Sequence, residues 1–298
     1  MEILPQIIVF AIIASAIYAL LATGLTLTFS TLDFINFAHG DMAMLGAFFF
    51  FSLYISQGLP LTVALILTIL IAAALGLFIE RTTFRPVRDK KSFIPLVLSI
   101  GVAILAQSLI TMFYGGGSQN YYKGGGSATV YNLFNGQITI TLGQIMIVVS
   151  AVVLLSGLYL FLKNTRTGKA IRAVSDNKEI AAIMGIDVNK TIMILFAIAT
   201  TLAAVAGLLV AFDQNLYPYM GLSLSIKVFA AIILGGVGKF RGAIVGAIII
   251  GFSENLIVGL TGIKSSYKEL IVFTIFIFVL MYKPYGIFGG QKEEVESR

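Results

Sequence analysis

The sequence predicts an all-α protein, a polytopic transmembrane helix bundle of about eight to nine spans with one cytoplasmic amphipathic helix. Of its 298 residues, 58% are apolar and only 11% are charged, whereas about 25% of residues are charged in soluble domains. The mean hydropathy is +0.97. The apolar residues fall into nine stretches with at most one charged residue each, and one long polar segment with helical periodicity separates the fifth from the sixth. We therefore expect a single transmembrane domain over residues 1–298.

The nine stretches are close to the length that a helix needs to cross a bilayer. A helix rises about 1.5 Å per residue, so about 20 residues cross the ~30 Å of hydrocarbon. The predicted spans cover residues 7–29, 37–55, 61–79, 95–113, 141–162, 191–212, 224–237, 243–260 and 270–282. The seventh and ninth are shorter and bounded by glycine, which favours a broken or re-entrant helix at either place.

The distribution of lysine and arginine predicts the orientation, because cytoplasmic loops carry an excess of both. If the loops after the third and fifth spans are cytoplasmic, sixteen of the twenty Lys and Arg residues lie inside. We expect a multi-pass protein of the plasma (inner) membrane. Its N-terminus then lies outside the cell and its C-terminus in the cytoplasm. The net charge of +6 then reflects orientation in the lipid bilayer, and we expect no nucleic-acid partner.

Residues 114–140 form the longest segment on the outer side. Two identical GGGS stretches, at 115–118 and 124–127, lie within it. Runs of glycine and serine are typical of flexible linkers. We therefore predict a flexible external loop over 114–140.

Several kinds of chemistry are excluded by composition. The chain has no cysteine and a single histidine, which removes disulfides, thiol nucleophiles and Cys- or multi-His metal sites. No G-x-x-x-x-G-K-[ST] phosphate-binding loop occurs. We therefore expect no catalytic residue, no metal site and no cofactor in this chain, and transport or conduction remains.

The polar segment at residues 163–190 is predicted to lie at the cytoplasmic face. Its apolar residues recur at helical spacing at Ile171, Val174, Ala181 and Met184. Gly185 suits the position after a helix end, and Asp187 or Asn189 suits the N-cap of the sixth span. Two interpretations stay open. The segment lies on lipid headgroups, or it presents its apolar stripe to a groove on a soluble partner.

A few polar residues enter the spans. Asn36, His39 and Asp41 open the second span, Glu254 lies in the eighth, and Lys227 is the one basic residue inside any span. A charge at mid-bilayer is disfavoured by about 2.5–3.5 kcal/mol, so such groups face a bundle interior or water. The first three either cap a helix and make structural hydrogen bonds, or line the inner end of a translocation path. Glu254 is either a structural polar lock or a substrate contact.

Four stretches carry a family resemblance. Residues 179–185 read EIAAIMG, and residues 36–47 read NFAHGDMAMLGA. A glycine-rich run covers residues 234–246 and is followed by Gly251 and Glu254, and residues 283–289 read KPYGIFG. The first is similar to the E-A-A-x-x-x-G element of ABC importer permeases, with Ile180 intervening. Together the four resemble the branched-chain amino acid permeases of such importers, over nearly the whole chain.

The resemblance implies a transmembrane permease subunit of an ATP-driven importer for branched-chain or related amino acids. It also implies a second permease subunit, homologous or identical, two cytoplasmic ATPase subunits that bind ATP and magnesium, and an external substrate-binding protein. The residues it assigns to coupling with the ATPases are Arg172, Glu179, Ala181, Ala182 and Gly185. The candidates for the translocation path are Asn36, His39, Asp41 and Glu254.

Two other classes of function stay open on the residues alone. A self-sufficient secondary carrier or channel would use intramembrane acids, and Asp41 and Glu254 are the candidates. A membrane-embedded enzyme would need a nucleophile and a base, for which His39 with a serine is the available pair.

Overall fold

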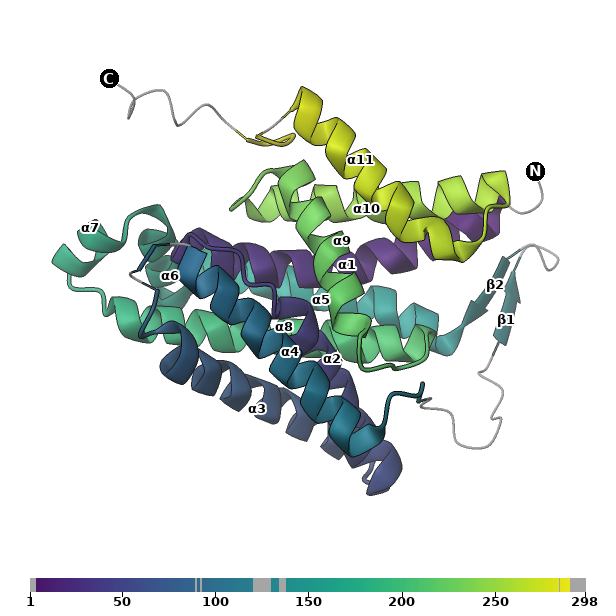
Figure 1. The fold of residues 1–298 in the computed structure, drawn as a ribbon, viewed down its shortest axis with the longest axis horizontal. Coiled ribbons are helices and arrows are strands. Elements are labelled where there is room, and N and C mark those ends of the chain that lie inside the picture. Colours follow the sequence, from purple (N-terminus) through teal and green to yellow (C-terminus); the bar gives the residue numbers. More distant parts are fainter. Residues whose placement is uncertain are drawn as a thin grey trace.

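The computed structural model describes residues 4–289 except 89, 92, 120–129, 134–137 and 284. Nearly all of the described chain is helical (Figure 1). The helices are α1 (Leu4–Leu32), α2 (His39–Phe50), α3 (Leu61–Ile79), α4 (Phe93–Tyr114), α5 (Leu142–Asn164), α6 (Arg166–Asp176), α7 (Lys178–Ile183), α8 (Val188–Asp213), α9 (Met220–Gly235), α10 (Phe240–Thr261) and α11 (Lys268–Tyr282). Short helical turns continue α2 (Phe51–Ser56) and α3 (Glu80–Phe84) and precede α11 (Ser265–Tyr267).

A helix occupies each of the nine predicted spans, which confirms the all-α polytopic architecture. Within the described residues, six helices are long and apolar enough to cross a membrane: α1, α3 with its following turn, α4, α5, α8 and α10. The helices at the other three predicted spans are shorter, with 12 residues in α2, 16 in α9 and 15 in α11. The bundle thus contains six helices of spanning length.

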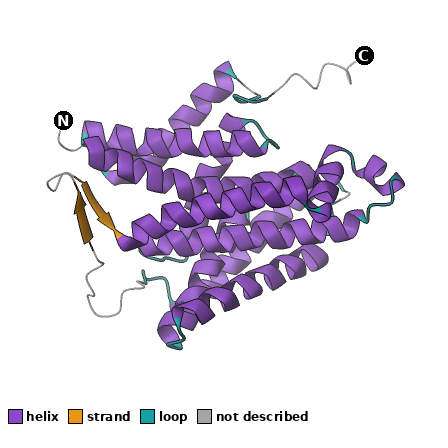
Figure 2. Cartoon of the chain, turned by 180° about the vertical axis from the view of Figure 1, so that it is seen from behind, coloured by secondary structure: helices purple, strands orange, loops and turns teal. Residues whose placement is uncertain are grey.

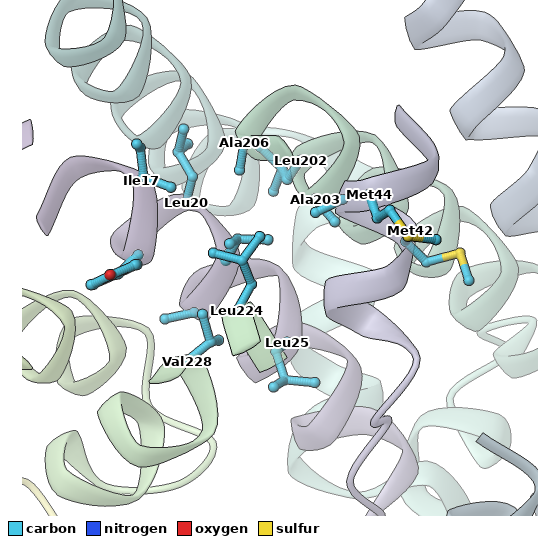
Figure 3. Close-up of a cluster of buried hydrophobic side chains, with 14 of the residues drawn as sticks. Ile17, Leu20, Leu25, Met42, Met44, Leu202, Ala203, Ala206, Leu224 and Val228 are labelled. Carbon is cyan, nitrogen blue, oxygen red and sulfur yellow. The ribbon is translucent and has the colours of Figure 1, made fainter. Parts of the chain in front are cut away.

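Helices α1 and α8 form the centre of the bundle. About two thirds (67%) of the apolar window of each is buried, against 22–28% for α3, α4 and α5. The outer helices expose large apolar side chains such as Phe78, Ile104 and Val153, as expected where lipid rather than water surrounds the protein. Figure 3 shows part of the core, where side chains of α1, α2, α8 and α9 meet.

Helix α2 packs unusually close to α8 because glycine lies on both sides of the contact. A Cβ atom added at Gly46 would lie 2.3 Å from the Cα of Ala204, and one added at Gly207 would lie 1.9 Å from the carbonyl oxygen of Ala43. No other residue type fits at these two positions without moving a backbone. Small residues at helix contacts are the main means of close packing in membranes.

The segment 114–140, predicted as a flexible external loop, lies partly outside the described residues and contains two short strands. Strands β1 (Val130–Leu133) and β2 (Ile138–Thr141) pair antiparallel, with Val130 opposite Thr141, and form the hairpin at one end of the bundle (Figure 2). The backbone of Gln119 also exchanges two hydrogen bonds with that of Leu216, at 2.8 and 2.9 Å. The β-branched and aromatic residues of these strands, among them Val130 and Tyr131, favour strand structure. The GGGS stretch at 124–127 lies outside the described residues.

Candidate translocation path and coupling surface

Helix α2 begins inside the bundle rather than at its end. After α1 the chain turns back as non-helical backbone over residues 33–38. The Nε2 atom of His39 lies 3.1 Å from the carbonyl oxygen of Leu21, which is in the second half of the 29-residue α1. We predicted that Asn36, His39 and Asp41 open the second span at its inner end. The structure places them deeper, because the segment before α2 inserts between α1, α4 and α9.

This insertion requires hydrogen-bond partners for the exposed backbone, since water is absent at that depth. Ser225 of α9 supplies two: its hydroxyl donates to the carbonyl of Phe37 and accepts the amide of Gly40, both at 3.0 Å. Ser99 of α4 accepts the amide of Phe37 at 3.1 Å. The side chain of Asn36 accepts the amide of Ala38 at 3.1 Å. Asn36 and His39 thus make hydrogen bonds within the bundle, and no described side chain caps the start of α2.

Asp41 occupies a junction of three helices. It is fully buried in the first turn of α2, where the positive end of the helix dipole favours a carboxylate. The amide of Gln107 on α4 donates to its Oδ1 at 2.9 Å. A Cβ atom on Gly221 of α9 would lie 2.4 Å from the same oxygen. Its Oδ2 has no hydrogen-bond partner among the described residues, so this acid is only half satisfied.

Glu254 lies in a second, separate cluster. The hydroxyl of Tyr18 donates to its Oε2 at 3.1 Å, and the ammonium groups of Lys227 and Lys268 lie 3.2 and 3.4 Å from its oxygens. The Lys227 ammonium also lies 5.6 Å from the centre of the Tyr18 ring. The side chain of Glu254 is 2% exposed. The ion pair with Lys227, which the sequence made a possibility, is therefore formed.

A cavity of about 750 Å³ opens beside this cluster and is lined by Tyr18, Lys227, Glu254 and Lys268. It lies at the end of the bundle where α1 begins and α8 and α10 end, away from α6 and α7 (Figure 1). Asp41 does not line it. The structure thus divides the four predicted path residues into one group at the start of α2 and Glu254 alone at the cavity. Sequence reasoning missed Tyr18 and Lys268, because no local pattern distinguishes them.

The polar segment between α5 and α8 forms two short helices. Thr165 caps α6, Asn177 caps α7, and Asp187 caps α8 by accepting the amide of Lys190 at 3.0 Å. Gly185, at φ +81°, ends the turn after α7 in the left-handed conformation that favours glycine. The predicted position of Gly185 after a helix end and the predicted N-cap at Asp187 are confirmed.

The predicted apolar stripe was expected to face lipid headgroups or a partner, but three of its four residues are buried within the chain. Ile171, Val174 and Ala181 are buried, but Met184 is 77% exposed. The sequence left open whether the segment forms one helix or two, and the extended backbone of Asn177 (φ −162°) separates α6 from α7.

Helix α7 projects from the bundle with an apolar tip. Ile180, Ile183 and Met184 are 59%, 84% and 77% exposed, and Figure 1 shows α7 at the far edge of the molecule. Of the five predicted coupling residues, the exposed ones are Arg172, Glu179, Ala182 and Gly185. Ala181 is buried and anchors α7 instead.

Comparisons with known proteins connect these features to one family. The family described as "Branched-chain amino acid transport system / permease component" matches residues 7–280. The chain belongs to this family. It is therefore a transport permease subunit and not an enzyme, as the sequence predicted.

Individual relatives agree with this assignment. The high-affinity branched-chain amino acid transport system permease protein LivH of Escherichia coli is 33% identical, over 94% of this chain and 93% of its own length. The corresponding protein BraD of Pseudomonas aeruginosa is also 33% identical, with the same coverage. Among solved structures, PsaBC from Streptococcus pneumoniae in complex with Fab matches with a TM-score of 0.51 over 94% of this chain and 91% of the other. Its sequence identity is 14%, so it supports the fold alone.

Proposed function

We propose that this chain forms the translocation path of an ATP-driven importer for branched-chain or closely related amino acids in the plasma membrane. The observation that carries the proposal is the correspondence to branched-chain amino acid permeases, which extends over 94% of the chain at 33% identity. Such breadth covers the bundle, the α6–α7 segment and the start of α2 together, rather than one shared motif.

The orientation and the number of crossings are part of this proposal. Helices α2, α9 and α11 complete three crossings that they do not make by length alone, which with the six helices of spanning length gives nine, the upper number that the sequence predicts. The exposed basic residues Lys90, Arg166 and Lys190 lie in the loop before α4 and around the α6–α7 segment. By the excess of Lys and Arg in cytoplasmic loops, the end with α6 and α7 faces the cytoplasm, and the N-terminus lies outside.

The tip of α7 is the proposed docking site for an ATPase subunit. A soluble protein seldom leaves three neighbouring large apolar side chains open to water, and such a patch is typical of an interface. Thr165, Asn177 and Asp187 cap the three helices of this region and fix the angle at which α7 projects. We expect two ATPase subunits, which bind ATP and magnesium, one on this chain and one on a second permease subunit. We also expect an external substrate-binding protein at the opposite end.

One observation favours the alternative of a self-sufficient secondary carrier. Asp41 has a buried oxygen without a hydrogen-bond partner among the described residues, which is how a proton- or ion-binding acid would look. Glu254, the other candidate, is already compensated by two lysines and is less suited to that role.

Transport assays in proteoliposomes separate the two functions. The permease is reconstituted with its partner permease, the ATPases and the binding protein, and uptake of radiolabelled leucine is measured with ATP, without ATP, and with an uncoupler. The proposed function predicts accumulation that needs ATP and survives the uncoupler. Accumulation by the permease without ATPase subunits, abolished by the uncoupler, would instead establish the carrier. An ATPase variant that binds but does not hydrolyse ATP is the matched control.

A further inference from the structure

The cavity beside Glu254 combines charged and apolar walls. Its volume of about 750 Å³ lies within the ~300–1,000 Å³ typical of small-molecule sites. One wall carries the Lys227, Glu254 and Lys268 side chains. Other parts of the lining are apolar and come from α1, α8, α9 and α10, namely Ile13, Ile17, Val210, Leu224 and Val258.

The charges on the first wall do not balance. Two ammonium groups, from Lys227 and Lys268, face the single carboxylate of Glu254. The lysine side chains are only 12% and 27% exposed, and the glutamate is 2% exposed. Lys268 also donates to the Oδ1 atom of Asn255 at 3.1 Å, so Glu254 and Asn255 together hold the two lysines beside the cavity. Ionisable groups placed inside the membrane usually serve a pathway, and two lysines that share one carboxylate at a cavity indicate an anionic ligand group that can compete for them.

The same cavity also offers negative charge. Asp213, at the end of α8, and Glu269, in the first turn of α11, both line it and are exposed. The amide of Gln144 donates to Asp213 at 3.1 Å, and the hydroxyl of Ser223 donates to Glu269 at 2.5 Å. Tyr217 lies on the same lining, and burial together with the Glu269 carboxylate raises its pKa. It therefore stays neutral and able to donate a hydrogen bond.

We propose that this cavity receives the cargo as a free zwitterionic amino acid with an aliphatic side chain. The carboxylate of the cargo binds Lys227 and Lys268, where it competes with Glu254. Its ammonium group faces Asp213 and Glu269. Its side chain lies against the apolar wall. The inference rests on the proposed function, because only an importer of such amino acids presents this cargo at the outer end.

Competition gives the site a means of release. Glu254 holds both lysines when the cavity is empty, so the cargo carboxylate replaces an existing ion pair rather than filling a vacant one. Each ion pair between the cargo and a lysine replaces an ion pair between that lysine and Glu254. The net gain in binding free energy is therefore small. The cargo binds weakly and can leave, which a translocation path requires. A purely structural cluster predicts something different: removal of any member loosens the fold and changes no ligand affinity specifically.

The test measures leucine binding to the assembled importer in lipid nanodiscs, without the binding protein, by equilibrium dialysis of radiolabelled leucine. The first variant is Lys268→Gln, chosen because this lysine is the most exposed member of the cluster. Its matched control is Lys264→Gln, which removes the same charge from an exposed position nearby that does not line the cavity. Basal ATP hydrolysis and elution volume report whether each variant is assembled.

We expect Lys268→Gln to weaken leucine binding about tenfold or more, the usual effect of losing a hydrogen bond to a charged group. Lys264→Gln should stay within about twofold, since it removes no contact with the ligand. Glu254→Gln should bind leucine at least as tightly as the unmodified chain, because the competing carboxylate is gone. On the unmodified importer, 3-methylbutylamine, which lacks the carboxylate, and 4-methylpentanoate, which lacks the ammonium group, should compete poorly with leucine.

Equal leucine affinity in Lys268→Gln and Lys264→Gln would overturn the inference, and so would effective competition by 3-methylbutylamine. Assembled Glu254→Gln that binds as weakly as Lys268→Gln would also overturn it. These outcomes leave the proposed function intact if the full importer still accumulates leucine with ATP. Absence of that accumulation in the unmodified importer would instead remove the proposed function itself.

Discussion

The variant Ser225→Ala should destabilise the protein more than Ser99→Ala or Thr201→Ala does. The Oγ atom of Ser225 donates to the carbonyl of Phe37 and accepts the amide of Gly40, both at 3.0 Å. Both partners belong to the non-helical segment and first turn that place α2 inside the bundle. Ser225→Ala leaves these two backbone groups without a partner where water cannot replace it.

The size of the effect follows from the number of groups left unsatisfied. Each buried polar group without a partner costs about 1–3 kcal/mol, so two cost about 2–6 kcal/mol. Ser99→Ala removes the acceptor of one such group, the amide of Phe37, and should cost about 1–3 kcal/mol. Thr201→Ala is the control, because its hydroxyl donates to a carbonyl of its own helix, that of Ala197, at 2.8 Å. Its loss should cost under about 1 kcal/mol.

The three variants are compared by thermal unfolding of the detergent-purified chain, followed by loss of the monodisperse peak on size exclusion. The expected order of midpoints is Thr201→Ala highest, then Ser99→Ala, then Ser225→Ala. A Ser225→Ala midpoint equal to that of Thr201→Ala would refute the reasoning, since it would mean that the segment before α2 does not depend on this hydroxyl. Restoring the hydroxyl with Ser225→Thr should recover part of the loss.

Three further outcomes are expected. Glu179→Lys alters the exposed α7 region and should lower ATP-driven leucine uptake about tenfold or more, the scale of a disrupted interface contact, while the purified chain keeps its midpoint. Gly185→Trp should lower uptake too, but it should also lower the midpoint, because the φ of +81° at Gly185 favours glycine. Unchanged uptake in both variants contradicts docking on α7. The chain has no native cysteine, so single cysteines report the side of the membrane. With an impermeant thiol reagent, a cysteine at Lys90 should react from the inside and a cysteine at Gly116 from the outside. The reverse pattern overturns the orientation. The variant His39→Gln should keep leucine uptake within about threefold of the unmodified chain, because glutamine can still donate a hydrogen bond to the Leu21 carbonyl. Complete loss of uptake in a normally folded variant would contradict a structural role for this histidine.

Much of the bundle was predictable because it depends on local patterns. Apolar stretches located every helix of the membrane region, and Asp187 and Gly185 marked the ends of the α7–α8 connection. These signals are carried by residues adjacent in sequence. Whether Lys227, the one basic residue within a predicted span, meets Glu254 could not be known from the sequence, because the two residues lie 27 positions apart on different helices.

The depth of α2 was not predictable, because distant residues determine it. Ser99 and Ser225 satisfy the backbone around Phe37 and Gly40 from two other helices, 62 and 185 to 188 positions away. Lys268, the first residue of α11, joins Glu254 of α10, and no local pattern distinguishes it from other lysines. Ile171 and Val174 were expected on an outward-facing stripe, but contacts with other parts of the chain, which a helical wheel cannot represent, bury them.

Helix α1 connects the two halves of the proposed mechanism. Near its end, Ser30 lies 3.2 Å from Ser175 of α6, and just after it Asp33 pairs with Lys178 of α7 at 3.0 Å. In its middle, Tyr18 donates to Glu254 beside the cavity. Asp33 is 75% exposed, and such surface pairs contribute little energy. We therefore expect the mechanical connection between the α6–α7 segment and the cavity to depend on the buried packing of α1 against α10 and α8. A movement of α6 that shifts α1 would move Tyr18 relative to Glu254. Loss of the Asp33 pair alone should leave coupling nearly intact, whereas a disturbed α1–α10 contact should not.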